Sequence, residues 1–193
     1  RLQGDWSSDV CSSDLADKKR IVLPEGMDRR IWEAAVEIVK DDIADLTVIA
    51  TEEDVKNNTE GLNLAGINII DPVRSDKLEK YTADLAELRR MKGMTIDEAR
   101  ELLTTDYVYY ACMMLRENEA DGVVSGACHS TANTLRPALQ LVKAKPGVKL
   151  VSAFFIMVVP DCEYGANGTF LFADCGLEQN PDPEKQEIGR AHV

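Results

Sequence analysis

The chain has 193 residues, of which 45% are hydrophobic and 29% charged, a composition typical of globular proteins and not of disordered chains, collagens or coiled coils. No apolar run approaches the roughly 18 residues needed to cross a bilayer, so we expect no membrane association. The net charge of −12 disfavours general binding of nucleic acid or of anionic membranes, but it permits a locally basic site for a small anionic ligand.

The two ends of the chain share a feature at the level of their coding DNA. One possible coding sequence for residues 188–193 has a reverse complement that encodes Asp-Val-Cys-Ser-Ser-Asp, which is residues 9–14. That DNA resembles a common short-read sequencing adapter. We therefore expect residues 1–15 and 188–193 to be adapter-derived tails, against the alternative of a Ser- and Asp-rich flexible end. Resequencing of the locus tests this expectation.

Strands and helices alternate in the pattern of the remaining chain. In chain order, we predict a strand at 20–23, a helix at 29–40, a strand at 46–50, a short helix from 52, a strand at 67–70, a helix at 75–92, a helix after a capping box at 95–98, a helix at 106–117, a strand at 122–125, a helix at 130–142, and strands at 149–159 and 169–173. This alternation predicts an α/β fold with a mainly parallel sheet.

Single residues sharpen several of these predictions. Asp28 and Thr51 are expected to cap helices, and Gly93 to end one. Pro137 is compatible with its helix if it lies within about the first turn. Asn167-Gly168 predicts a turn between the last two strands. The Met and Tyr residues of the helix at 106–117 are expected to be core rather than a cofactor site.

A connector rich in Lys, Pro and Gly at residues 144–147 indicates a domain boundary. We expect a first domain at 16–147 and the start of a second at 148–187, which has too few elements to bury a core of its own. The five cysteines have irregular spacings and no CxxC pair, which is typical of reduced thiols in a cytoplasmic protein. Two histidines leave little for a metal site, and we expect neither a metal nor a resident cofactor.

The most informative segment is DGVVSGACHSTANTLRPALQ at residues 121–140, where a strand leads through small residues into a helix. In parallel α/β sheets ligands bind at the carboxyl ends of strands. The small residues of this segment would let a ligand approach the backbone. Its hydroxyl groups are expected beside backbone amides that are free at the start of the helix, a combination that suits an anion such as phosphate. The guanidinium group adds a positive charge. The candidate ligand residues of this segment are Ser125, Gly126, His129, Ser130, Thr131, Thr134 and Arg136.

Simpler interpretations remain open for each of these residues. The Ser and Thr side chains are equally suited to capping the helix, and Arg136 to solvent. His129 is better interpreted as a hydrogen-bonded loop residue than as a base, because no nucleophile–base pair can be recognised beside it. Arg89 stands at the end of the long predicted helix, where cations are common.

Taken together, the motifs resemble the phosphate acetyltransferase (phosphotransacetylase) family. The segments that carry the resemblance are IVLPEG at 21–26, ELRRMKG at 87–93, DYVYYACMM at 106–114, the segment at 121–140, KLVSAFFIM at 149–157, VPDCEYG at 159–165 and GTFLFADCGLEQNP at 168–181. The resemblance implies a three-layer α/β/α fold in a two-domain architecture like that of isocitrate and isopropylmalate dehydrogenases, with the second domain truncated here. It also implies a homo-oligomeric parent protein.

The family transfers an acetyl group between coenzyme A and phosphate, so the implied ligands are CoA, acetyl-CoA, phosphate and acetyl phosphate. By this resemblance Arg89 and Arg136 are expected to bind phosphate groups, and Ser130 and Thr131 to line the same cleft. The family's serine, aspartate and arginine for thiol activation and carbonyl polarisation lie in a C-terminal part that has no match here. We therefore name no catalytic residue and expect the 193-residue chain itself to be inactive.

Two other functions stay open. Similar domains occur behind malic enzymes as acyl-CoA-sensing modules, and a dehydrogenase domain upstream of Ala16 would favour that interpretation. Phosphate butyryltransferases are relatives that handle longer acyl chains. LRPALQ and FLFADCG fit the acetyl family better, although the residues of the acyl pocket cannot be assigned from this sequence.

Overall fold

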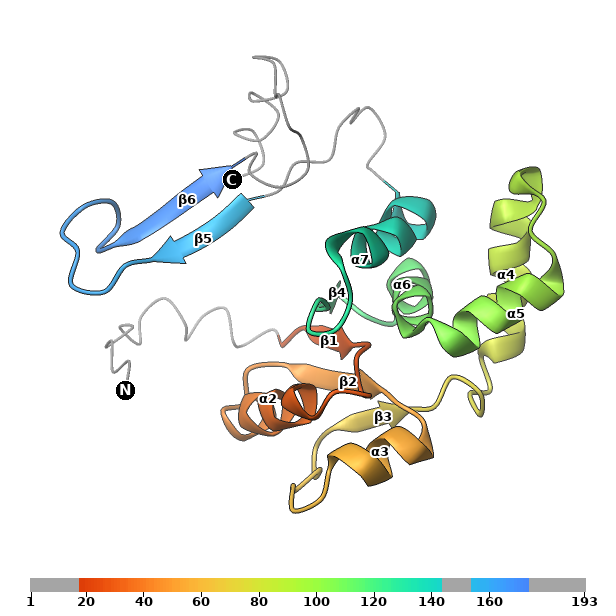
Figure 1. Ribbon diagram of the computed structural model, residues 1–193, viewed down its shortest axis with the longest axis horizontal. Coiled ribbons are helices and arrows are strands. Elements are labelled where there is room, and N and C mark those ends of the chain that lie inside the picture. Colours follow the sequence, from red (N-terminus) through yellow and green to blue (C-terminus); the bar gives the residue numbers. More distant parts are fainter. Residues whose placement is uncertain (1–17, 144–153, 174–193) are drawn as a thin grey trace, which may run out of the picture. The chain divides into compact units, whose positions relative to one another are not determined.

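A computed structural model describes residues 18–143 and 154–173 of the chain, which divides into two compact units, residues 1–143 and 144–193 (Figure 1). The expected adapter-derived tails at 1–15 and 188–193 lie outside the described residues. The expected boundary after residue 147 and the first part of the predicted strand at 149–159 lie outside them too. These expectations stay predictions.

The first unit is built on a parallel sheet of four strands in the order β3-β2-β1-β4. The strands are β1 (Arg20–Leu23), β2 (Asp45–Ile49), β3 (Asn68–Ile70) and β4 (Gly122–Val123). The central strand β1 pairs in parallel with both β2 and β4. The predicted α/β fold with a mainly parallel sheet is thus confirmed, and the carboxyl ends of all four strands lie at one edge of the sheet.

Alternate residues of the central strands enter two separate apolar clusters. Val22 and Ile49 belong to a cluster formed with the helices α4 (Leu78–Arg89), α5 (Ile96–Thr105) and α6 (Tyr107–Arg116). Leu23 and Val48 belong to a cluster formed with α2 (Arg29–Lys40) and α3 (Glu52–Asn58). Successive side chains of a strand point to opposite faces, so helices cover both faces of the sheet. Trp32 of α2 is fully buried in the second cluster.

The helices of this unit are α2 (Arg29–Lys40), α3 (Glu52–Asn58), α4 (Leu78–Arg89), α5 (Ile96–Thr105), α6 (Tyr107–Arg116) and α7 (Thr131–Pro137). The predicted caps are confirmed, because Asp28, Thr51 and Thr95 accept hydrogen bonds from backbone N–H groups of the first helical turn. The residues of α6 from Tyr107 to Met114 are all buried, as expected of core positions. No helix in the described part of the chain is long and apolar enough to span a membrane.

Two predicted helices differ in detail from the structure. The helix predicted from Ser75 begins at Leu78, because the Ser75 hydroxyl accepts a hydrogen bond from the Lys77 amide and so forms a turn before the helix. Pro137 lies at the end of the seven-residue α7, well beyond its first turn. The condition set for Pro137 is therefore not met, although Pro137 still belongs to the helix as its last residue. Because Pro137 has no N–H to continue the α-helical ladder, the chain widens there into a π-helical turn, Ala138–Val142.

The described part of the second unit is a hairpin of two antiparallel strands, β5 (Phe154–Val158) and β6 (Thr169–Ala173). Asn167 and Gly168 both have positive φ angles, 51° and 82°, and Ala166 and Thr169 exchange backbone hydrogen bonds across them. The predicted turn is confirmed as a tight two-residue turn at Asn167-Gly168, at the end of the longer segment 159–168 that connects the two strands.

Candidate functional site

The candidate site lies where β1 and β4 end. The two strands are neighbours, and their pairing continues past β4 because the Val124 amide donates to the Val22 carbonyl at 3.0 Å. The loop after β1, residues 24–27, therefore lies beside the loop after β4, residues 124–130. This is the edge at which parallel sheets bind ligands, and the predicted ligand residues of the segment at 121–140 follow it directly.

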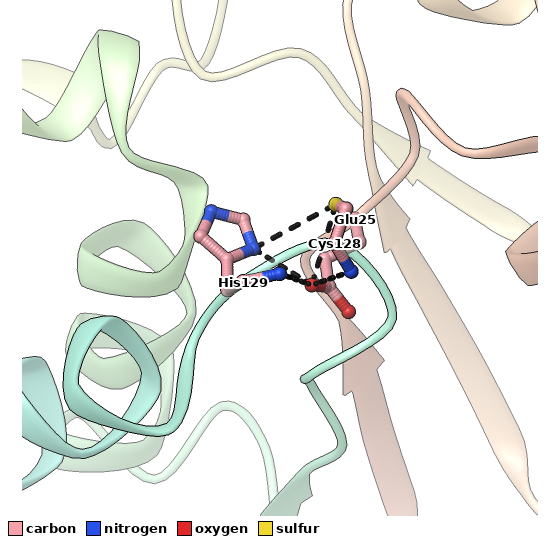
Figure 2. Close-up of side chains that lie close together, drawn as sticks. All are labelled: Glu25, Cys128 and His129. Carbon is pink, nitrogen blue, oxygen red and sulfur yellow. Dashed lines mark hydrogen bonds and ion pairs between the residues drawn. The ribbon is translucent and has the colours of Figure 1, made fainter.

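Glu25 connects these two loops. Its side chain is fully buried, and its carboxylate accepts hydrogen bonds from four consecutive backbone amides. The amides of Gly126 and Ala127 donate to Oε2 at 2.8 Å each, while those of Cys128 and His129 donate to Oε1 at 2.9 and 3.0 Å. Figure 2 shows Cys128 and His129 directed at this carboxylate. Four amides that converge on one anion define the path of the loop backbone.

The surroundings of Glu25 strongly favour its ionised form. Burial raises the pKa of its carboxyl, but the hydrogen bonds from the backbone amides and from His129 outweigh burial and bring the pKa to about 2. Glu25 is therefore a carboxylate at any physiological pH, and its oxygens only accept hydrogen bonds.

Further contacts hold the same pair of loops. Arg30 of α2 donates to the Ala127 carbonyl at 2.8 Å and pairs with Asp28, the cap of its own helix. Gly26 leaves no room for a side chain, since a Cβ there would lie 2.5 Å from the Ile49 carbonyl oxygen. The loop after β1 thus lies tightly against the end of β2 and presents Glu25 to the loop after β4.

The predicted hydroxyl residues have different surroundings. Ser130 caps α7 by accepting from the Asn133 amide, and Thr131 is the exposed first residue of that helix. The hydroxyl oxygens of Ser125 and Thr134 are buried and have no hydrogen-bond partner among the described residues. A buried unpaired hydroxyl is costly, and a bound ligand would relieve this cost.

The backbone amides of the loop that precedes Ser130 are occupied. Those of residues 126–129 are bonded to Glu25, as described above, so the part of the loop before Ser130 receives the chain's own anion. His129 is indeed a hydrogen-bonded loop residue, because its Nδ1 lies 2.7 Å from Glu25 Oε1.

The two predicted arginines come close to the same buried tyrosine. Tyr109 of α6 donates to Gln140 Oε1 at 2.9 Å. Burial raises the pKa of its hydroxyl, whereas the charges of Arg136 and Arg89 both lower it. Both guanidinium groups therefore lie within electrostatic reach of this side chain. Neither arginine forms a side-chain hydrogen bond or ion pair with any described residue.

Arg89 also lines a pocket of about 440 Å³ between the end of α4 and α5. The pocket is also lined by Lys92, by the apolar side chains of Met94 and Leu102, and by Glu98 and Glu101. The Arg89 Nε atom is buried without a partner among the residues that the structure describes. Buried donors of this kind are normally paired, so this end of α4 suits an acceptor such as a phosphate oxygen.

Cys128 does not have the environment of a nucleophile. Cys128 is exposed as a residue, but partial desolvation of its thiol raises the thiol pKa, and the adjacent Glu25 carboxylate raises it further, to about 11. One ligand atom each from Glu25, Cys128 and His129 could together hold a metal ion. However, the four amides directed at this carboxylate create a positive potential and occupy its lone pairs, so the cluster is far better suited to hydrogen bonding than to a cation.

Two site residues were missed by the sequence predictions. Glu25 stood in the IVLPEG motif without a role, although it directly follows a predicted buried strand, which is the position used to select the segment at 121–140. Tyr109 was assigned to the core, which is correct for its burial but leaves out its position within electrostatic reach of both arginines. Only the packing of α6 against α7 could show that second role.

Comparisons with known proteins agree with the motifs. Residues 7–190 match the family described as "Phosphate acetyl/butaryl transferase"; this range includes residues 7–15, whose assignment to a foreign tail stays a prediction. The chain is 54% identical over 170 residues to a phosphate acetyltransferase of Acetivibrio thermocellus, which covers 88% of the chain and 51% of the relative. It is 50% identical over 178 residues to that of Thermoanaerobacterium thermosaccharolyticum, which covers 92% of the chain and 53% of the relative.

Solved structures give the same result. The EutD phosphotransacetylase from Staphylococcus aureus has a TM-score of 0.78 and 33% identity, with 91% of this chain and 52% of that chain covered. A phosphotransacetylase from Streptococcus pyogenes has a TM-score of 0.80 and 29% identity, with 95% and 56% covered. The chain thus spans about half the length of the relatives it matches. By sequence and by fold, it belongs to the phosphate acetyl/butaryl transferase family.

Proposed function

We propose that a protein of the relatives' full length containing this chain transfers an acetyl group between coenzyme A and phosphate. The reaction is acetyl-CoA plus phosphate giving acetyl phosphate plus CoA, and it is reversible. The observation that carries the proposal is the 50–54% identity to two phosphate acetyltransferases across about nine tenths of the chain. Family membership alone would leave the acyl group open, because the family description includes both acetyl and butyryl transfer.

The geometry supports the binding part of this reaction. Arg89 and Arg136 supply two positive charges that both act on Tyr109, in a protein of net charge −12. Guanidinium groups are rigid donors that suit phosphate oxygens, and both substrates carry phosphate. The unpaired buried hydroxyls of Ser125 and Thr134 add donors at the carboxyl end of β4. We assign to this chain the binding of CoA and of the acyl phosphate.

In the proposed mechanism the CoA thiolate attacks the carbonyl of the acyl phosphate. A base must remove the thiol proton, and donors must stabilise the oxyanion that forms on the carbonyl oxygen. His129 has only one ring nitrogen free for such a task, since Nδ1 is bonded to Glu25. We assign both the base and the oxyanion donors to the part of the relatives that this chain does not cover.

The proposal includes the architecture of the whole protein. We propose a three-layer α/β/α arrangement in two domains, like isocitrate and isopropylmalate dehydrogenases, with residues 148–187 as the start of the second domain. The helices on both faces of the parallel sheet fit this arrangement. A homo-oligomeric protein in the cytoplasm is part of the same proposal, and the free thiols of Cys112, Cys128 and Cys162 fit a reducing compartment.

Calorimetric titration of the chain with CoA tests the binding role of the arginines. Arg136→Ala and Arg89→Ala are each expected to raise the dissociation constant about tenfold, because each removes a charge-assisted hydrogen bond to phosphate. Arg90→Ala is the matched control, since Arg90 is exposed and faces Glu87 at 3.6 Å. Equal affinities of all four proteins would refute the assignment of Arg89 and Arg136.

Enzyme assays distinguish acetyl transfer from butyryl transfer, and they compare the 193-residue chain with a protein of the relatives' length. With acetyl phosphate and CoA, the 193-residue chain is expected to form no acetyl-CoA, whereas a protein of the relatives' length is expected to be active. That protein should prefer acetyl phosphate to butyryl phosphate, and Arg136→Ala should raise its KM for CoA or for acetyl phosphate. Acetyl-CoA formation by the 193-residue chain, or a preference for butyryl phosphate, would contradict the proposal.

A further inference from the structure

The cluster that joins the loops after β1 and β4 has a property that the proposed function does not use. In many phosphate sites, successive backbone amides converge on a bound anion. Here the amides of residues 126–129 converge on Glu25, at 2.8–3.0 Å. Because this anion is a buried side chain of the same protein, the loop has its shape before any ligand arrives.

The same carboxylate determines the state of the His129 ring. Nδ1 lies 2.7 Å from Glu25 Oε1, and an ionised carboxylate can only accept a hydrogen bond (Figure 2). Nδ1 must therefore carry the proton in that bond. In the neutral ring this leaves Nε2 without a proton, which is the less common tautomer of free histidine. Nε2 has no hydrogen-bond partner among the described residues, and 18% of the side chain is exposed.

We propose that Glu25 is a positioning residue of the ligand site: it holds the backbone of residues 126–129 and orients His129 so that Nε2 is the ring atom that contacts CoA. The inference rests on the proposed function for the identity of the ligand. The fixed loop and the fixed tautomer are properties of the chain alone. They can therefore be measured separately from CoA binding.

The first experiment needs no substitution in the candidate site. Long-range ¹H–¹⁵N correlation spectra of the ¹⁵N-labelled chain, recorded at a pH where the ring is neutral, distinguish a protonated nitrogen from a bare one. His192 is the only other histidine, and a His192→Gln variant assigns the signals. The expected result is a neutral His129 ring with protonated Nδ1 and bare Nε2. A neutral ring with protonated Nε2 would overturn the proposal.

The second experiment measures the loop. Glu25→Gln keeps the size of the side chain but replaces one carboxylate oxygen with an NH₂ group. This group is a donor, so the two backbone amides that were bonded to that oxygen lose their acceptor. Hydrogen exchange at the amides of residues 126–129 is expected to accelerate at least tenfold. Asp121→Asn is the matched control, because Asp121 also accepts several hydrogen bonds but lies at the other end of β4. Unchanged exchange in Glu25→Gln would show that Glu25 does not hold the loop.

The third experiment connects the ring to the ligand. In His129→Asn the side-chain amide lies near the position of the former Nδ1. In His129→Gln the longer side chain brings the amide near the position of the former Nε2. In CoA titrations His129→Asn is expected to bind about tenfold more weakly than the wild type, and His129→Gln to recover part of the loss. Wild-type affinity in His129→Asn would overturn the contact with Nε2. Absence of CoA binding by the wild-type chain would instead contradict the assignment of CoA binding to this chain, and the tautomer and exchange results would still decide the positioning role.

Discussion

The strands β1 and β4 are joined by a carboxylate at each end, and the two carboxylates act differently. At the amino end, Asp121 accepts hydrogen bonds from the backbone amide and the guanidinium of Arg20 at 2.7–3.0 Å, and both side chains are partly exposed. At the carboxyl end, Glu25 is fully buried and accepts from four amides of another loop. The partly exposed Asp121–Arg20 contact joins the ends of two strands, whereas the buried Glu25 carboxylate fixes the backbone of a loop.

This difference shows how the fold prepares the candidate site. An exposed ion pair exchanges readily with water and contributes little to stability or shape. A buried carboxylate bonded to backbone amides leaves those amides without partners when it is removed, and so the loop must change its path. The end of β4 that carries the predicted ligand residues is therefore the end whose shape the chain determines most closely.

The largest expected effect is on stability, from removal of the Glu25 carboxylate. Glu25→Ala leaves a cavity where a fully buried side chain was and four backbone amides without their acceptor, and it should lower the free energy of unfolding by about 4 kcal/mol. Asp121→Ala should lower it far less, because its partners return to water. Urea unfolding followed by circular dichroism measures both changes. Equal losses in the two variants would remove the distinction between the two ends.

The second effect is on the pH dependence of stability. The pKa of Glu25 is about 2 in the folded protein and 4.5 without the fold, so the folded state binds the proton more weakly. Its ionised form therefore contributes stability that is complete above pH 4.5 and is lost as the pH falls toward 2, about 3 kcal/mol in total. The stability difference between the wild type and Glu25→Gln should narrow by about this amount over that range. A difference that is constant with pH would contradict the lowered pKa.

The third comparison uses one glycine at each end. A Cβ on Gly26 would lie 2.5 Å from the Ile49 carbonyl oxygen and 2.6 Å from the Ala50 Cβ, so Gly26→Ala forces the backbone apart. We expect a loss of about 2 kcal/mol. A Cβ on Gly122, at the amino end of β4, would meet only the flexible tip of Ile21 at 3.0 Å. Thermal unfolding should show a clearly smaller loss for Gly122→Ala, and the reverse order would refute the tight packing assigned to the carboxyl end.

Much of this arrangement could be predicted from the sequence. Helix caps such as Asp28 and Thr95 depend on residues close together in the chain, and the strand at 20–23 is a short apolar run ended by Pro24. The parallel sheet followed from the alternation of strands and helices. The position of Pro137 was not predicted because α7 widens into a π-helical turn, and no local pattern indicates that change.

The candidate site was less accessible to prediction, because its contacts join distant parts of the chain. No partner was predicted for the amides of residues 126–129, since Glu25 lies about a hundred positions earlier. Only the pairing of β1 with β4 brings them together, and the order of strands in the sheet cannot be inferred from spacing. The position of Tyr109 within electrostatic reach of Arg89 and Arg136 likewise depends on the packing of three helices.

The smallest expected effect is on the reactivity of Cys128. Partial desolvation and the Glu25 carboxylate raise the pKa of its thiol to about 11, so at pH 8 it should react with iodoacetamide far more slowly than free cysteine. Glu25→Gln removes the negative charge but not the desolvation, and it should raise the rate at pH 8 only severalfold. Mass spectrometry of the alkylated peptide measures the rate at this residue.

The pH profile separates a change of charge from a change of access to Cys128. If Glu25 acts through its charge, the rates of the wild type and of Glu25→Gln converge as the pH approaches the raised pKa, because both thiols are then ionised. If the substitution merely opens the loop, the variant reacts faster by the same factor at every pH. Asp121→Asn should leave the rate unchanged in both cases, because its carboxylate lies at the other end of β4. A wild-type rate at pH 8 equal to that of free cysteine would show that the buried carboxylate does not influence the thiol.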